Sequence, residues 1–119
     1  MFKKCLLTVL TLLPLLAIAC KKEDLQTFEC AGPTPTYTAD IKAIVDANCA
    51  VSGCHNSTTK ANGIDLSTYE KVKSESSKAR FLGAIQRLPG YKQMPKDKAK
   101  LADANIQKIS CWVQNGQVE

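Results

Sequence analysis

The sequence predicts a small all-α domain of about four short helices. Several segments carry apolar residues at the three-and-four spacing of an amphipathic helix, and none shows the apolar–polar alternation of a half-buried strand. Glycine and proline residues separate these segments. With 119 residues, the chain has room for one such domain behind two N-terminal segments.

Residues 1–19 are predicted to be a signal peptide. A basic start at Lys3 and Lys4 precedes an apolar run that is too short for a membrane-spanning helix, which needs about 20 residues. The junction Leu16-Ala17-Ile18-Ala19-Cys20 resembles the lipobox of bacterial lipoproteins. The resemblance implies a lipid on Cys20 that anchors the protein to a bacterial membrane, facing the periplasm or the cell surface, and the charged residues that follow favour the outer membrane. The alternative is ordinary cleavage beside Cys20.

Residues 20–37 are predicted to form a flexible tether, because the segment starts with charged residues and because Pro33 and Pro35 prevent a helix. The folded domain then covers residues 38–119, which is small for a self-sufficient core. A buried macrocycle bonded to the chain would add apolar mass.

The chain has a formal net charge of +5, but its basic residues do not form a stripe interleaved with aromatic residues. Nucleic acid is therefore not an expected partner.

The first two helices are expected at residues 38–49 and 67–73. Thr38 is a suitable N-cap for the first, and the second has the capping-box spacing from Ser67 to Glu70. The apolar face of the first helix consists of Ile41, Ile44 and Val45.

The last two helices are expected on either side of a polar loop. One begins at Ser76 or Ser77 and ends at Leu88-Pro89-Gly90, and the other begins near Asp103 and ends at Asn115-Gly116. Their apolar faces consist of Phe81, Leu82, Ile85 and Leu88 in the first case, and of Ile106, Ile109 and Val113 in the second.

The six cysteines are assigned one by one. Cys5 is removed with the signal peptide, Cys20 takes the lipid, and Cys49 and Cys54 belong to the motif described next. Cys30 and Cys111 remain, and we predict a disulfide between them, because exported proteins fold in an oxidising compartment. The alternative is two free thiols.

The segment Cys49-Ala-Val-Ser-Gly-Cys54-His55 contains the groups that a c-type haem requires: two sulfurs for the porphyrin vinyl groups and a nitrogen for the iron. His55 is the only histidine of the chain. After removal of Met1 with the signal peptide, Met94 is the only methionine, and it lies before Pro95 in a polar loop. We therefore predict His55 and Met94 as the two axial ligands; a solvent-exposed Met94 is the alternative.

From Thr38 to Gly116 the chain resembles a class I mono-haem cytochrome c. The order of features is similar: an amphipathic helix, the two cysteines with the histidine, short helices, a Met-Pro loop, and a final helix whose aromatic residue, here Trp112, packs across the first helix. The spacer between Cys49 and Cys54 is two residues longer than the usual one. Cys54 keeps its position before the histidine, so Cys49 either forms the second thioether or pairs with Cys54.

The resemblance implies a cytochrome c-like fold around covalently bound haem c. It also implies electron transfer by an Fe(II)/Fe(III) couple, redox partner proteins, no small-molecule substrate at the iron and no enzymatic activity. Two sets of residues are expected around the haem: an apolar wall that excludes water, and lysines that attract acidic partners or simply face solvent. The wall consists of Leu66, Tyr69, Leu82, Leu88 and Ile109, and the lysines are Lys92, Lys96 and Lys98.

Two other classes of function remain open at this point. In the first, Met94 dissociates, and the protein is a haem sensor or a peroxidase-like protein. In the second, the chain is a haem-free surface module with disulfides Cys30–Cys111 and Cys49–Cys54. A variant of the second class is a zinc site made of Cys49, Cys54, His55 and a further cysteine.

Overall fold

The computed structural model describes residues 23–119, and within them every regular element is helical. The predicted signal peptide and the predicted lipid site at Cys20 lie outside the described residues. In the described part, no helix combines the length and the apolar character that crossing a membrane requires. The all-α fold class predicted from the sequence is confirmed.

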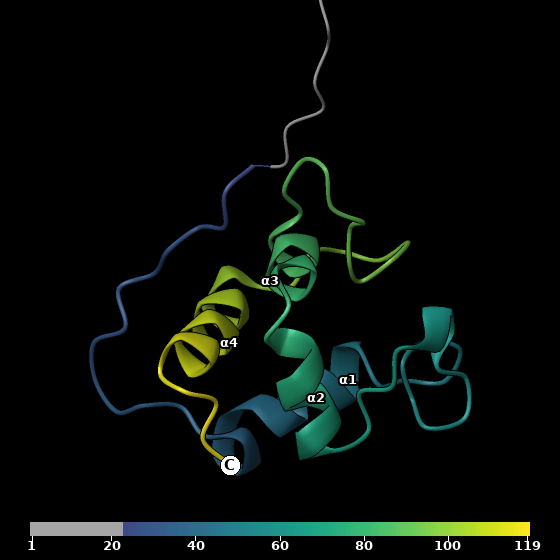
Figure 1. Cartoon of the computed structure of the whole chain (residues 1–119), viewed down its shortest axis with the longest axis horizontal. Coiled ribbons are helices and arrows are strands. Elements are labelled where there is room, and N and C mark those ends of the chain that lie inside the picture. The colour runs from purple at the N-terminus through teal and green to yellow at the C-terminus, as the bar shows by residue number, and fades with distance from the viewer. Residues whose placement is uncertain (1–22) are drawn as a thin grey trace, which may run out of the picture.

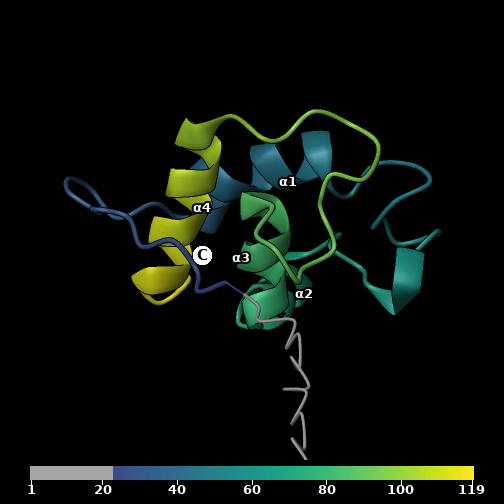
Figure 2. The same ribbon diagram turned by 90° about the horizontal axis from the view of Figure 1, so that it is seen from above.

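The elements follow in a simple order around one core (Figures 1 and 2). A π-helical turn, η1, runs directly into α1, and a loop with one short 3₁₀ turn, η2, leads to α2 and α3. A second loop without helix connects α3 to α4. Their bounds are η1 Tyr37–Ile41, α1 Lys42–Asn48, η2 Ala61–Gly63, α2 Tyr69–Ser76, α3 Ala79–Gln86 and α4 Asp103–Gln114.

The N-terminal caps differ from the expected ones. Thr36, rather than Thr38, caps the first helical stretch: its Oγ1 accepts the Ala39 N–H, and Asp40 accepts the Thr36 N–H in return. The predicted capping box of α2 is wrong, because the Ser67 hydroxyl instead donates to Asp65, 2.6 Å away. These exchanges move helix starts by one or two residues and leave the helices themselves in place.

The boundary between α2 and α3 is also later than expected. The hydroxyls of Ser76 and Ser77 both donate to the Lys73 carbonyl, so they complete the end of α2 instead of starting α3. At the other end, α3 ends at Gln86, before Arg87 in a left-handed conformation. Only α4 has the expected start at Asp103.

The core lies where η1, α1, α2, α3 and α4 meet, and Trp112 is its largest fully buried side chain. Trp112 belongs to the same apolar cluster as Ile41, Ile44 and Val45, and its ring centre lies 6.0 Å from that of Tyr37. The expected packing of the last helix against the first is therefore confirmed.

The C-terminal tail closes this core. The carbonyl of Val118 accepts both the Tyr37 backbone N–H at 2.8 Å and the Trp112 indole N–H at 2.7 Å. The Gln117 carbonyl accepts the Tyr69 hydroxyl, and its side-chain amide donates to the Lys73 carbonyl. Two tail residues thus join η1, α2 and α4.

Residues 23–36, which we call the strap, have no helix and run past α4 along one side of the molecule (Figures 1 and 2). Several contacts hold the strap, and two of them stand out. Gln26 exchanges two hydrogen bonds with the Gln86 side chain, and Cys30 forms a disulfide with Cys111 of α4. The predicted Cys30–Cys111 disulfide is confirmed. The described part of the predicted tether is thus attached to the domain.

Candidate functional site

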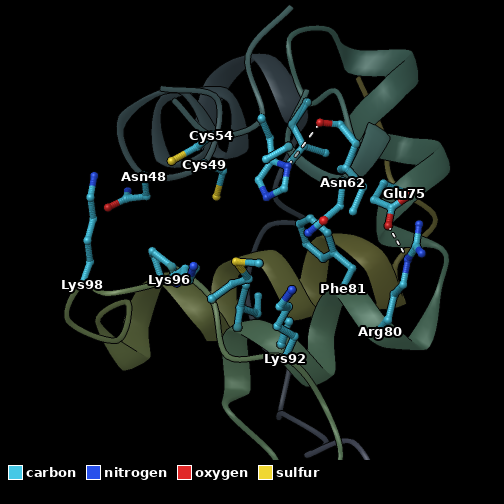
Figure 3. Close-up of a pocket in the computed structure, with 18 of the residues that line it drawn as sticks. Asn48, Cys49, Cys54, Asn62, Glu75, Arg80, Phe81, Lys92, Lys96 and Lys98 are labelled. Carbon is cyan, nitrogen blue, oxygen red and sulfur yellow. Dashed lines mark hydrogen bonds and ion pairs between the residues drawn. The ribbon is translucent and has the colours of Figure 1, made fainter. Parts of the chain in front are cut away.

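One pocket of about 560 Å³ gathers the predicted haem ligands, and Cys49, Cys54, His55 and Met94 all line it. This volume lies within the range of about 300–1,000 Å³ that is typical of small-molecule and cofactor sites. The residues come from three parts of the chain: the end of α1 with the following loop, the α2–α3 pair, and the loop after α3 (Figure 3).

The loop from Cys49 to His55 is closed by its own backbone. The N–H of Cys49 donates to Val45 at the end of α1, and the N–H of His55 donates to the Cys49 carbonyl at 3.0 Å. Gly53 supplies a positive φ of 81° that the bend requires. Figure 3 shows the Cys49 and Cys54 side chains together on one side of the pocket. The longer spacer is therefore accommodated as a bulge that keeps both thiols beside the imidazole.

His55 is 8% exposed, and its ring has a fixed orientation. Nδ1 lies 3.2 Å from the Ile64 carbonyl oxygen, which can only accept, so Nδ1 carries the proton. The lone pair of Nε2 is then available to a metal, and metal-binding histidines commonly donate their other ring N–H to a backbone carbonyl in this way. The His55 carbonyl accepts the Leu66 N–H, which fixes the backbone as well.

Met94 is partly buried and packs against the core cluster. Its N–H donates to the Ala84 carbonyl of α3 at 3.0 Å, and the Arg87 guanidinium supports the loop by donating to the Pro95 carbonyl. The loop approaches α3 closely, because a Cβ on Gly83 would lie only 2.5 Å from the Tyr91 ring. The thioether is thus positioned by α3.

The apolar wall of the pocket differs from the predicted one. Of the five expected residues, Leu66 lines the pocket, whereas Tyr69, Leu82, Leu88 and Ile109 do not. Tyr69 instead faces Tyr37, and Ile109 lies in the core. The observed wall consists of Ile64, Leu66, Phe81, Ala84 and Ile85. Phe81 and Ile85 belong to the apolar face predicted for α3, but the two members of that face assigned to the wall were Leu82 and Leu88, which do not line the pocket.

A charged group that the sequence analysis missed lies at the rim. Glu75 is 8% exposed and accepts two ion-paired hydrogen bonds of 2.6 Å, one from Arg80 Nε and one from Lys78 Nζ. Burial alone would raise the pKa of the Glu75 carboxyl, but the two cations outweigh it and hold the pKa below its usual range. Figure 3 shows the Glu75–Arg80 pair. Because Arg80 uses Nε for this pair, its two terminal nitrogens are left for an anion in the pocket.

The two pocket cysteines are both free thiols. Burial, together with the neighbouring Cys54, raises the pKa of Cys49 to about 11, so Cys49 is a neutral thiol at physiological pH. No Cys49–Cys54 disulfide is present, in contrast to the haem-free alternative. The zinc alternative lacks its further cysteine among residues 23–119, because Cys30 and Cys111 bond to each other, and no group of three or more potential zinc ligands is found there.

Comparison of the chain with protein-family models, with curated proteins and with solved structures found no match. The residues of the pocket therefore provide the observations that bear on function.

Proposed function

We propose that this protein is a c-type cytochrome that carries single electrons and is attached to a membrane by an N-terminal lipid. One observation supports this most strongly: a single pocket contains two free thiols, an imidazole with an uncommitted Nε2, and the one methionine of the described residues. Sequence order alone does not bring Met94 to the other three residues; the fold does.

The residues present fit haem c. Cys49 and Cys54 would form the thioethers, and His55 Nε2 and Met94 Sδ would be the axial ligands. When bound, the group supplies a one-electron Fe(II)/Fe(III) couple, whose potential a methionine ligand raises relative to a second histidine. The protein orients the imidazole through Ile64 and excludes water with the apolar wall.

Two features of the chain serve this function directly. The terminal nitrogens of Arg80 can neutralise a carboxylate of the bound group, with Glu75 holding the guanidinium in place. With His55 and Met94 both holding the iron, no position at the metal would remain for a substrate, and the proposed role is that of a carrier and not of an enzyme. Its partners are other redox proteins.

The decisive experiment is to produce the protein in a bacterial host with haem-attachment machinery. We expect a red protein whose mass includes a covalent haem and whose pyridine haemochrome spectrum reports the number of thioethers. His55→Ala and Cys54→Ala should each abolish stable attachment. The matched control is Ser52→Ala, at an exposed position of the same loop that does not line the pocket, and it should keep its haem. A colourless wild-type protein would refute the proposal.

Carbon monoxide distinguishes the carrier from the sensor or peroxidase-like alternative. With Met94 bound, the reduced protein should bind carbon monoxide slowly or not at all. Met94→Ala should keep the covalent haem and bind the gas rapidly. Equally rapid binding by both proteins would show that Met94 is not a stable ligand.

A further inference from the structure

We infer that the loop between α3 and α4 docks on an anionic phospholipid surface, so that the rim of the pocket faces the membrane. Two independent observations lead to this inference: where the strap begins, and where the fold leaves positive charge unbalanced. Neither requires the cofactor, so the inference goes beyond the proposed electron transfer.

The strap begins beside this loop. The Glu23 N–H donates to the Pro89 carbonyl at 3.3 Å, and three residues later Gln26 is bonded to Gln86. The Cys30–Cys111 disulfide then fixes the strap to α4 covalently. Figure 1 shows the described chain beginning at the end of the molecule that carries the loop after α3, with the C-terminus at the opposite end.

This position limits the distance from the loop to a membrane anchor. Cys20 precedes Glu23 by three residues, a stretch that spans at most roughly 10 Å when fully extended. A lipid on Cys20, which forms part of the proposed function, would therefore hold Pro89 and the start of the loop close to the bilayer surface.

Positive charge is unbalanced at the same end. In the part of the chain that the structure describes, most cationic side chains have a carboxylate partner; the pairs are Lys42–Asp46, Lys60–Asp65, Lys71–Asp65, Lys78–Glu75, Arg80–Glu75, Lys100–Asp103 and Lys108–Asp40.

Three lysines of the pocket rim, Lys92, Lys96 and Lys98, differ from this pattern. Among residues 23–119, Lys92 Nζ and Lys98 Nζ have no ion pair or hydrogen bond, and Lys96 has only a 3.8 Å contact with the exposed Asp97. All three lysines are exposed to solvent. Figure 3 shows them along one side of the pocket. We call these three residues the lysine rim.

The chemistry of the rim fits lipid phosphates. Each lysine near an anionic leaflet raises the affinity for the membrane about fivefold, so three lysines together change it by roughly 100-fold. The attraction falls off within a Debye length of about 8 Å at physiological ionic strength. Lys92 follows Pro89, the residue bonded to Glu23, by three positions, and Lys96 and Lys98 lie in the same loop, so a lipid on Cys20 would bring this loop toward the phosphates.

The test uses the full mature chain with Cys20→Ser, so that no lipid contributes to binding. The protein is sedimented with phosphatidylcholine vesicles that either contain or lack phosphatidylglycerol. We expect binding only to the anionic vesicles and its loss in high salt. The variant Lys92→Gln/Lys96→Gln/Lys98→Gln should bind about 100-fold more weakly. The control Lys42→Gln/Lys71→Gln/Lys108→Gln loses the same charge elsewhere and should bind nearly as well as the parent.

A second measurement identifies which part of the protein contacts the membrane. Lipidated protein in the same vesicles should show slower amide hydrogen exchange in residues 90–98 when phosphatidylglycerol is present. Equal weakening in both triple variants would refute the inference, since net charge alone would then be the cause. Unchanged vesicle binding in the lysine-rim variant would also refute it and would leave the rim to an acidic protein partner. The absorption spectrum of each sample reports the haem separately, so failure of the cytochrome proposal is recognised independently.

Discussion

Removal of the Cys30–Cys111 disulfide should cost a large part of the stability of the domain. The two cysteines are 81 residues apart in sequence, and the bond closes nearly the whole described chain into one loop. In the chain-entropy model, a loop of this length restricts the unfolded state by about 4.5 kcal/mol. The free energy of unfolding of a small domain is about 5–15 kcal/mol, so the loss is a substantial fraction.

Apart from Phe28, which is partly buried against the core, the strap has only hydrogen bonds that would survive the substitution, including one from Gln107 to the Glu29 carbonyl. The Gln26–Gln86 pair and the Glu23–Pro89 hydrogen bond are partly or fully open to solvent, and each contributes about 0.5–1.5 kcal/mol at most. They cannot replace the covalent link. The Cys30→Ala/Cys111→Ala variant should therefore unfold at a much lower denaturant concentration than the wild type.

Urea unfolding of both proteins in the same cofactor state measures the effect. We expect a shift of the midpoint by about 2–4 M, because m is about 1–3 kcal/mol per molar urea for small proteins. Wild-type protein treated with a reductant should match the variant. A loss below about 1 kcal/mol would refute the reasoning, because it would mean that the unfolded chain is already compact or that the strap does not depend on the bond.

Three further predictions concern the pocket. In the cofactor-free protein, Cys49 should react with iodoacetamide about tenfold faster per pH unit up to about pH 11, since only the thiolate reacts; a plateau near pH 8 would contradict its burial. Glu75→Gln should lower the free energy of unfolding by about 1 kcal/mol, because both cationic partners are half exposed. The pKa of Glu75 is lowered, so this loss should be complete above its ordinary value of 4.5 and should vanish as the pH falls through the native value; a loss that persists in acid would exclude the ion pairs as its cause. Gly83→Ala should cost about 1–3 kcal/mol in thermal unfolding, because the new methyl group collides with the Tyr91 ring, and it should cost much less in a Tyr91→Ala background; equal costs would show that the ring is not the obstacle.

Where the sequence predicted the fold correctly, the signal came from apolar periodicity or from covalent chemistry. The spacing of Ile106 and Ile109 located α4, and counting cysteines gave the Cys30–Cys111 pair. Hydroxyl side chains were less predictable. Ser67 had two partners within reach, the start of α2 and Asp65, and the choice between them depends on a turn that the sequence does not reveal.

The candidate site also has a part that the sequence predicted and a part that it did not. Residue chemistry selected Cys49, Cys54, His55 and Met94, and the fold collects all four. The wall and the rim were harder to predict, because they depend on how α2 and α3 cross. Phe81 was recognised as an inward-facing residue, yet only tertiary structure decides that it lines this pocket as well as belonging to the core cluster that contains Trp112.

The tail contacts of Gln117 and Val118 have a consequence for the response of the domain to proteolysis. A cut before these residues would leave the amide of Tyr37 and the indole of Trp112 without their acceptor. Because the Trp112 side chain is fully buried, water could replace that acceptor only if the core opened. One cleavage in this short segment would therefore loosen the start of η1 and the end of α4 together.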